Sequence, residues 1–187
     1  MTIHHMVALN MVGPGDLDRR RALLLLGLGG ALVLAGCGST SRRFTTIGPT
    51  ETPLNLDPAG REASVAQAML LVNTPYRYGG NTPQGGFDCS GLVAYVFSQV
   101  AQGLTRRLPR STAQWAAVTV PVDEAALQRG DLVFFNTTGA RFSHMGIYVG
   151  DGQFVHAPST GGTVRKQAVA DRYFGPRYQG GRRVFAA

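Results

Sequence analysis

Apolar side chains recur at helical spacing in two segments of the chain. The first segment, residues 62–73, places them three or four positions apart and is followed by Pro75, so it predicts a helix that ends before the proline. The second segment opens at Cys89 or Ser90, repeats the same spacing and is expected to stop near Gly103. The apolar stripes consist of Val65, Ala68, Met69 and Val72 in the first segment and of Leu92, Val93, Val96, Phe97 and Val100 in the second.

Beyond Pro109 the pattern changes to short apolar runs that are separated by Gly, Asp and Pro. These runs predict strands at residues 131–135, 145–149, 153–156 and 183–185. Helices therefore come first in the sequence and strands follow. That order predicts an α+β domain in which the helices pack on one antiparallel sheet.

A different apolar run, residues 22–34, follows the basic cluster Arg19-Arg20-Arg21. It leads into Leu34-Ala35-Gly36-Cys37, which resembles a bacterial lipobox, so residues 1–36 have the layout of a secretory signal. We expect Cys37 to become the acylated N-terminus of the exported protein. Because a membrane-spanning helix needs roughly 20 apolar residues, this run predicts a lipid-anchored chain rather than a spanning one.

The stretch from Cys37 to residue 60 is rich in Ser, Thr, Pro and Gly and has no apolar period, which indicates a flexible tether over residues 37–60. Residues 61–187 then have the ordinary size of one domain with its own core. Gly38, directly after the cysteine, is not the aspartate that is associated with retention at the inner membrane. We therefore expect a periplasm-facing location on the outer membrane if the cell has two membranes.

The formal charge of +7 comes almost wholly from arginine, because Lys166 is the only lysine. The arginines are scattered rather than clustered with aromatic side chains, and an exported protein does not meet nucleic acid, so a nucleic-acid partner is not expected. The simpler partner for such a basic surface is an anionic cell envelope.

With Cys37 assigned to the lipid, Cys89 is the one cysteine left for chemistry. An unpaired thiol in an oxidising compartment calls for a function, since exported proteins normally pair their cysteines. At a helix start that Asp88 is placed to cap, backbone amides favour the thiolate and can hold an oxyanion. The alternative is a buried core cysteine, which is the commoner fate of an isolated Cys, but the flanking Asp88, Ser90 and Gly91 are small or polar.

The predicted domain contains two histidines, His144 and His156, each at the end of a predicted strand. A three-residue loop at residues 150–152 would put both on one face, about 7–8 Å apart. A two-residue turn at residues 151–152 would shift the register by one and turn them to opposite faces. A triad with Cys89 therefore requires the longer loop or a compensating bulge, with His144 as base and His156 orienting it.

Two other interpretations of these residues stay open. In one, the histidines lie on a surface hairpin and have no joint role. In the other, Cys89, His144 and His156 supply three zinc ligands. The histidines lack the close pairing that zinc motifs usually show, so we expect no metal and no other cofactor.

Six sequence blocks, in order and covering nearly the whole predicted domain, resemble the NlpC/P60 family of cell-wall cysteine peptidases. The blocks are PYRYGG (75–80), FDCSGL (87–92), LPRS (108–111), GDLVFF (130–135), SHMGIYV (143–149) and FVHA (154–157). The resemblance implies a papain-like α+β fold. It also implies that Cys89 is the nucleophile, His144 the general base and His156 the third, orienting residue.

The resemblance further implies that Tyr76 points its hydroxyl toward the cysteine and stabilises the oxyanion together with the Cys89 amide. A structural alternative is that Tyr76 packs the glycine-rich loop. Asp88 and Ser90 are implied to lie beside the cleft and to contact the amine or carboxylate of a substrate. Their alternatives are capping by Asp88 and hydrogen bonding of first-turn amides by Ser90.

The family resemblance implies hydrolysis of peptide bonds in peptidoglycan stems, most often the γ-D-glutamyl–diaminopimelate bond. Some tethered single-domain members with this layout instead cut the D-alanyl–diaminopimelate cross-link. Two hypotheses from other classes stay open, a non-catalytic wall-binding lipoprotein and an acyltransferase or amidase acting on lipids or small amides. The implied partners are peptidoglycan stem peptides and, through the lipid anchor, a membrane.

Overall fold

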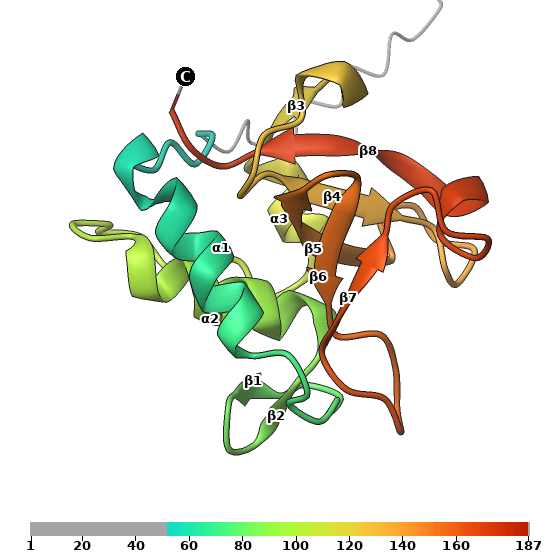
Figure 1. Ribbon diagram of the computed structural model, residues 1–187. Coiled ribbons are helices and arrows are strands. Elements are labelled where there is room, and N and C mark those ends of the chain that lie inside the picture. The colour runs from blue at the N-terminus through green and yellow to red at the C-terminus, as the bar shows by residue number, and fades with distance from the viewer. Residues whose placement is uncertain (1–51, 187) are drawn as a thin grey trace, which may run out of the picture. The chain divides into compact units, whose positions relative to one another are not determined.

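The computed structural model of the chain describes residues 52–186, which Figure 1 shows as a coloured ribbon. The predicted signal segment, the lipidation site Cys37 and the predicted tether up to residue 51 lie outside these residues. Within residues 52–186, no helix has the length and apolar composition needed to cross a membrane.

Two longer helices form where the apolar spacing predicted them. Helix α1 spans Arg61–Leu70 and helix α2 spans Cys89–Val100. Helix α1 ends at Leu70, before the predicted residue 73. Asn73 itself adopts a left-handed backbone with φ of 75°, which is not helical. Met69, expected in the apolar stripe, is 41% exposed. The unpredicted short elements are helix α3 (Thr112–Ala117) and the 3₁₀ turns η1 (Pro58–Gly60), η2 (Glu124–Ala126) and η3 (Gly175–Arg177).

A six-stranded sheet forms the second layer, and each pair of neighbouring strands is antiparallel. In the sheet order these strands are β3 (Val120–Val122), β8 (Tyr178–Arg183), β4 (Leu132–Phe135), β5 (His144–Gly150), β6 (Gln153–His156) and β7 (Arg165–Ala168). A separate two-stranded ladder joins β1 (Asn81–Thr82) to β2 (Gly86–Phe87). The predicted α+β class is confirmed.

The strand predictions were right in the middle of the sheet and failed toward its edges. Strands β4, β5 and β6 lie where the apolar runs placed them. The strand expected at residues 183–185 is wrong, because β8 occupies residues 178–183 and its two glycines interrupt the apolar pattern. The edge strands β3 and β7 were not predicted, because β3 contains Pro121 and β7 is mostly polar.

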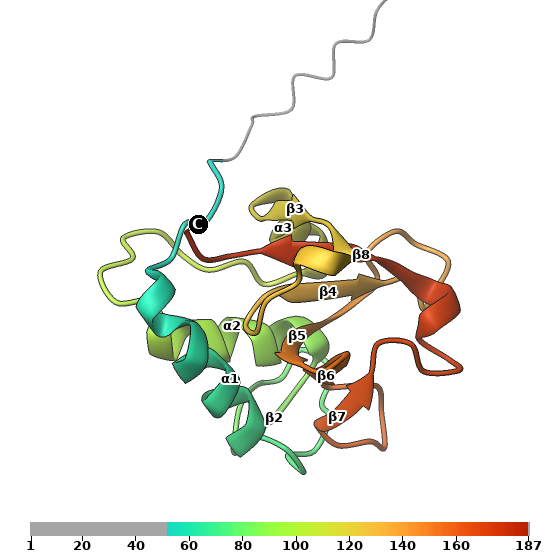
Figure 2. The same cartoon turned by 45° about the horizontal axis from the view of Figure 1, so that its top comes forward.

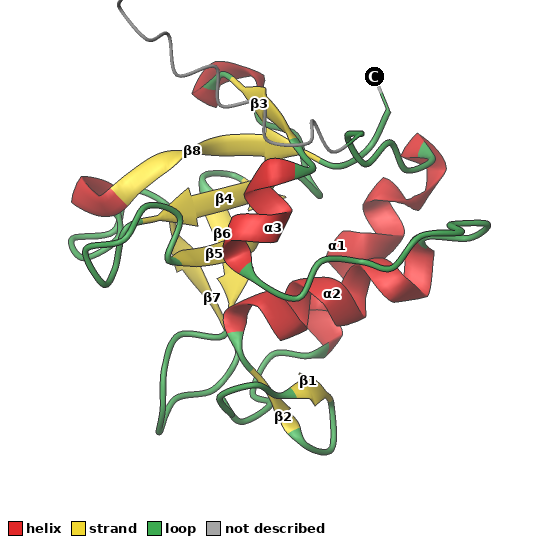
Figure 3. Cartoon of the chain, turned by 180° about the vertical axis from the view of Figure 1, so that it is seen from behind, coloured by secondary structure: helices red, strands yellow, loops and turns green. Residues whose placement is uncertain are grey.

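Helices α1 and α2 lie together on one face of the sheet, with α2 packed on β5 (Figures 1 and 2). Seen from behind in Figure 3, α3 lies beside β4 and β8, and its Trp115 packs on Phe97 of α2 with ring centroids 5.6 Å apart. The main core between helices and sheet includes Val65, Leu92, Val93, Phe97, Trp115, Leu132, Phe134, Met145 and Ile147. A second cluster on the opposite face consists of Val133, Phe135, Phe154, Val169 and Phe174.

The packed domain begins earlier than the predicted boundary at residue 61. Leu54 and Leu56 are buried, with 2% and 5% exposure. The backbone N–H of Leu54 donates to the Val118 carbonyl at 2.6 Å, and that of Leu56 donates to the Val184 carbonyl at 3.0 Å. This segment therefore belongs to the domain, and the predicted end of the tether at residue 60 is wrong. Polar residues surround the two leucines, so no apolar pattern marked the start of the domain.

The β5–β6 hairpin sets the register of the two histidines. At its tip Gly150 pairs with Gln153, which leaves a two-residue turn. Next to the tip Tyr148 pairs with Phe154, so Val149 is an extra residue on β5. This bulge restores the register of a three-residue loop and places both histidines on one face of the sheet, as the compensating-bulge alternative predicted.

Candidate active site

The candidate nucleophile, Cys89, is the first residue of α2, and Asp88 caps that helix. The Asp88 Oδ1 accepts a hydrogen bond from the Gly91 N–H at 2.6 Å. The Asp88 backbone is extended, with φ of −88° and ψ of 175°, so the chain turns into the helix at the cysteine. Cys89 is a partly exposed residue on the first turn of α2, as the predicted helix start required.

Close backbone contacts hold the glycine-rich loop, residues 75–80, against the first turn of α2. A Cβ atom on Gly91 would collide with the carbonyl oxygen of Gly80, and one on Gly80 would collide with the carbonyl oxygen of Gly86. Side chains are therefore excluded where the loop meets the helix. This requirement explains why glycine occupies these positions around Cys89.

Tyr76 is fixed in this loop and lines the same cleft as Cys89. Its backbone forms a parallel bridge with Phe87, and its N–H donates to the Gly162 carbonyl at 2.8 Å. Burial raises the pKa of the Tyr76 hydroxyl, and the nearby Cys89 is the second cause. The hydroxyl therefore keeps its proton and can donate a hydrogen bond into the cleft.

The two histidines are joined by a short hydrogen bond between buried side chains. The distance from His144 Nε2 to His156 Nδ1 is 2.8 Å, and the ring planes are nearly perpendicular at 84°. The contact leaves Nδ1 as the His144 nitrogen that is available to Cys89. For this nitrogen to accept a proton, Nε2 of His144 must carry one and donate it to His156.

Phe174, which the sequence patterns did not single out, covers the histidine pair. Its ring stacks on His144 with centroids 5.7 Å apart and an interplanar angle of 28°. It meets His156 edge-on, with centroids 4.9 Å apart, while Phe154 lies 4.6 Å from His156. The residue is 4% exposed. This aromatic cover excludes water from the bond between the histidines.

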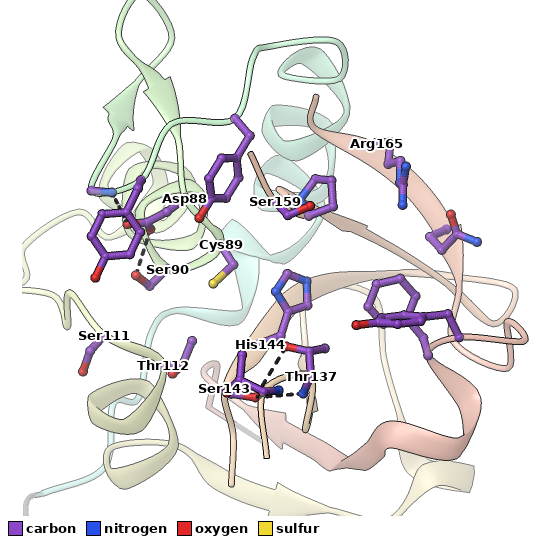
Figure 4. A pocket seen from close by; sticks show the side chains of 18 of the residues that line it. Asp88, Cys89, Ser90, Ser111, Thr112, Thr137, Ser143, His144, Ser159 and Arg165 are labelled. Atoms are coloured by element: carbon purple, nitrogen blue, oxygen red, sulfur yellow. Dashed lines mark hydrogen bonds between the residues drawn. The ribbon is translucent and has the colours of Figure 1, made fainter. Parts of the chain in front are cut away.

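A single cleft of about 1030 Å³ brings the predicted residues together. In Figure 4 the Cys89 sulfur and the His144 ring face one another, with Asp88 and Ser90 beside the cysteine. His156 lies behind His144 and does not line the cleft. The lining also includes Arg110, Thr137, Ser143, Ser159, Arg165, Gln167, Asp171, Tyr173 and Phe174.

Burial gives the thiol and the two imidazoles unusual pKa values. It raises the pKa of Cys89 to about 11, and the Asp88 carboxylate adds to this shift. It lowers the pKa of His144 to about 4 and that of His156 to about 2. Backbone N–H groups, including that of Met145, lower the Cys89 pKa by a smaller amount. Burial thus outweighs the helix-start effect that the sequence predicted, and the site without a ligand holds an uncharged thiol and imidazole near neutral pH.

Asp88 and Ser90 have structural partners that the family resemblance did not require. Besides capping the helix, Asp88 accepts from the Ser90 hydroxyl at 2.9 Å and from the Gly79 N–H at 2.9 Å. The Ser90 hydroxyl also lies 2.9 Å from the carbonyl oxygen of Arg110. Both side chains border the cleft, but internal hydrogen bonds occupy both carboxylate oxygens and the hydroxyl.

Two further residues in the family-like blocks have structural contacts, although Ser111 also lines the cleft. Ser111 forms a capping box with Gln114 at the start of α3. The buried Asp131 binds Arg61 at 3.1 Å and Arg183 at 2.8 Å. Among residues 52–186 no group of three or more His, Cys, Asp or Glu side chains is arranged to hold a metal ion.

Sequence comparison shows similarity to known proteins over this same region. A profile of the NlpC/P60 family matches residues 73–183. The chain is 36% identical over 126 residues to Murein DD-endopeptidase MepH of Escherichia coli K12, covering 66% of this chain and 45% of that protein. It is 37% identical over 128 residues to Gamma-DL-glutamyl hydrolase of Bacillus subtilis 168, covering 67% and 30% respectively. It is 42% identical over 121 residues to Probable peptidoglycan endopeptidase LytE of the same organism, covering 64% and 33%.

The chain therefore spans between 30% and 45% of the length of these three relatives. Solved structures show the same fold. The NlpC/p60 domain of the peptidoglycan hydrolase SagA aligns with a TM-score of 0.55 at 33% identity, covering 65% of this chain and 97% of that one. A Staphylococcus aureus structure described as similar to lipoprotein, NLP/P60 family, aligns with a TM-score of 0.60 at 27% identity, covering 73% and 45%.

Proposed function

Because the chain belongs to the NlpC/P60 family, we propose that its domain is a cysteine peptidase that hydrolyses peptide bonds in the stem peptides of peptidoglycan. The observation that carries the proposal is one arrangement of three side chains. Cys89 at the start of α2 faces His144, and His144 is hydrogen-bonded to His156 at 2.8 Å. The names of the similar endopeptidases support this class of substrate.

In the proposed reaction the Cys89 sulfur attacks the scissile carbonyl carbon while the thiol proton passes to Nδ1 of His144. The resulting oxyanion accepts hydrogen bonds from the Cys89 N–H and the Tyr76 hydroxyl. When the carbon–nitrogen bond breaks, His144 returns the proton to the leaving amine. His144 then takes a proton from water, whose oxygen attacks the thioester carbon. The carbon–sulfur bond breaks, the stem leaves as a carboxylic acid, and His144 returns the proton to the Cys89 sulfur.

The shifted pKa values are compatible with this sequence of steps. A neutral His144 can accept the thiol proton across the whole neutral range, because its pKa is lowered to about 4. The transfer creates an imidazolium beside a thiolate, and the attraction between these opposite charges offsets part of the cost of burying each one. His156 accepts the hydrogen bond of His144 Nε2 and so holds the ring in the required orientation.

Two bonds are candidates for cleavage. The first is the γ-D-glutamyl–diaminopimelate bond within one stem, and similarity to a protein named Gamma-DL-glutamyl hydrolase supports it. The second is the D-alanyl–diaminopimelate cross-link, which similarity to a protein named Murein DD-endopeptidase supports. In both bonds diaminopimelate supplies the leaving amine.

We also propose that the protein is exported and acylated at Cys37, which would place the catalytic domain in the cell envelope. The lipobox-like sequence before Cys37 supports this assignment. Labelling of cells with radioactive palmitate should mark the wild-type protein and leave Cys37→Ala unmarked. Equal labelling of both proteins would contradict the proposal.

Defined muropeptides distinguish the two bonds. A monomeric tetrapeptide contains the γ-D-glutamyl–diaminopimelate bond but no cross-link, whereas a dimer contains both bonds. The enzyme preparation should begin before Leu54, because Leu54 and Leu56 belong to the core. Cleavage of the monomer, read by mass spectrometry, would assign the first bond, and cleavage of the dimer into two intact tetrapeptides would assign the second. Absence of any product that depends on Cys89 would favour a wall-binding role.

A further inference from the structure

Two arginines and two carboxylates line the cleft, and they differ in how far they are hydrogen-bonded within the protein. Its charged lining residues are Asp88, Arg110, Arg165 and Asp171. Both carboxylates are already used within the protein. Asp88 accepts from Gly91 N, Ser90 Oγ and Gly79 N, and Asp171 accepts from Tyr173 N, Phe174 N and Gln167 Nε2. Hydrogen bonds thus hold both carboxylates in place, whereas the guanidinium groups of the two arginines keep N–H donors that a ligand could use.

The two arginines differ in how far they are engaged. Arg110 donates to the Gly79 carbonyl at 3.4 Å. Arg165 is exposed, and its side chain has neither a hydrogen bond nor an ion pair with any other residue in the described range 52–186. Its guanidinium is thus an unpaired cation on the wall of the cleft. The planar guanidinium presents two parallel N–H donors, which match a carboxylate.

The fold places Arg165 beside the histidine pair. Arg165 is the first residue of β7 and pairs with His156, the last residue of β6. Its positive charge contributes to the lowered pKa of both His144 and His156, so it lies within electrostatic range of both rings. In Figure 4 Arg165 lies on the His144 side of the cleft, across from Asp88 and Ser90.

The direction of the substrate follows from the proton transfers, and this step rests on the proposed function. His144 gives its proton to the leaving amine, so the residue that supplies this amine must lie against His144. That is the side of the cleft on which Arg165 lies. We propose that Arg165 binds a carboxylate of the residue that supplies the leaving amine.

Diaminopimelate fits this assignment. It is the amine-supplying residue in both candidate bonds, and each of its two amine-bearing carbons also carries a carboxyl group. A stem in which the free carboxylate of this residue is converted to a carboxamide loses the charge that the guanidinium recognises. Arg165 is therefore a specificity-determining residue. It favours stems whose diaminopimelate has a free carboxylate over stems in which that carboxylate is amidated.

The test compares two stem peptides that differ only in a carboxylate or a carboxamide on diaminopimelate. The full-length enzyme should cleave the carboxylate peptide with the higher kcat/KM, by about tenfold or more, since a hydrogen bond between charged groups is worth that much. In Arg165→Gln this ratio should fall close to one, mainly through KM. Loss of the Arg165 charge also changes the His144 pKa. This change affects the cleavage of both peptides alike, so it cancels in the ratio of their kcat/KM values.

Lys166→Gln is the matched control, because it removes one positive charge from the adjacent position of β7, which does not line the cleft. This variant should keep the wild-type ratio. The inference is overturned if Arg165→Gln also keeps the ratio, or if the wild type does not distinguish the peptides.

A binding measurement separates this inference from the proposed function. Calorimetry with Cys89→Ala should show that the carboxylate peptide binds more tightly than the carboxamide peptide, and Arg165→Gln in that background should remove the difference. If the wild type cleaves neither peptide but this difference is found, the hydrolase proposal fails and the carboxylate contact stands. If the difference is absent, the contact is rejected.

Discussion

At the scale of single residues, Asp88 both stabilises α2 and disfavours the nucleophilic form of Cys89. Its carboxylate caps the helix through Gly91, and its negative charge is the second cause, after burial, of the raised Cys89 pKa. Asparagine keeps one accepting oxygen for the cap to Gly91, gives up the acceptor of the Gly79 N–H, and removes the charge. Asp88→Asn should therefore lower the Cys89 pKa and speed alkylation by iodoacetamide several-fold at mildly alkaline pH.

Mass spectrometry of the alkylated protein, taken at a series of pH values, measures this effect. Asp171→Asn is the control, because Asp171 lines the same cleft but is not among the causes of the Cys89 shift. An unchanged alkylation profile in Asp88→Asn would show that the carboxylate does not act on the thiol.

His156 should matter less than the two residues it supports. Cys89→Ala should abolish turnover, and His144→Ala should reduce kcat by about 10²–10⁴-fold, as expected when a general base is removed. His156→Ala leaves the base in place but removes the partner of its Nε2, so we expect a milder loss in kcat. Steady-state kinetics on a defined stem peptide would rank the three variants by their loss in kcat. A loss in His156→Ala as large as in His144→Ala would contradict an orienting role.

At the scale of elements, the turn from Asp171 to Phe174 closes the site from the side that the helices leave open. Asp171 accepts hydrogen bonds from the backbone N–H groups of Tyr173 at 2.7 Å and of Phe174 at 3.3 Å. The turn thereby holds the Phe174 ring over His144, and that ring keeps the imidazole buried. Burial is the main cause of the lowered His144 pKa.

Phe174→Ala should therefore raise the His144 pKa from about 4 toward its ordinary value of 6.5, because water would reach the imidazolium. Since His144 must be neutral to accept the thiol proton, the acid limb of kcat/KM should move to higher pH. Phe174→Leu keeps an apolar cover and should move the limb less. An acid limb that stays in place while kcat falls would indicate a structural role for the ring without an effect on the base.

Elements with a buried apolar face could be predicted from the sequence, whereas polar strands and turns could not. The spacing of apolar residues located α1 and α2, and the start of α2 placed Cys89 correctly, because both helices bury one face on a core. The polar strand β7 and the turn at Phe174 carry no such pattern, so Arg165 and Phe174 were missed. The Val149 bulge was foreseen as an alternative only because a functional pairing of the histidines required it.

The Cys89 pKa shows a second limit of prediction from sequence. A helix start favours the thiolate, and the backbone amides do act in that direction. The degree of burial and the charge of Asp88 depend on tertiary packing, and together they reverse the net shift. The sequence predicted that Asp88 caps α2. The hydrogen bonds from Gly79 N–H and the Ser90 hydroxyl to Asp88, in contrast, depend on the folded site and had no signal in the sequence.

At the scale of the whole molecule, two buried neutral histidines make the fold sensitive to acid. In the folded protein the His144 pKa is lowered from 6.5 to about 4 and the His156 pKa is lowered to about 2. Between pH 6.5 and about 4 the unfolded chain therefore binds more protons than the folded one. The free energy of unfolding should fall as the pH falls through this window, by about 1.4 kcal/mol per pH unit for each histidine.

Urea unfolding at neutral pH and at about pH 5 would measure this dependence. His156→Asn should show a shallower slope, because one of the two protonating groups is gone. Equal stability of the wild-type protein at both pH values would contradict the buried, neutral state of the pair.

We propose Cys89 as the nucleophile of a peptidoglycan hydrolase. The most direct measurement is the digestion of purified peptidoglycan by wild type and by Cys89→Ala, with new free amines of diaminopimelate quantified by mass spectrometry. We predict that the wild type releases these amines and that Cys89→Ala releases none. Equal release by both proteins would contradict this role of Cys89.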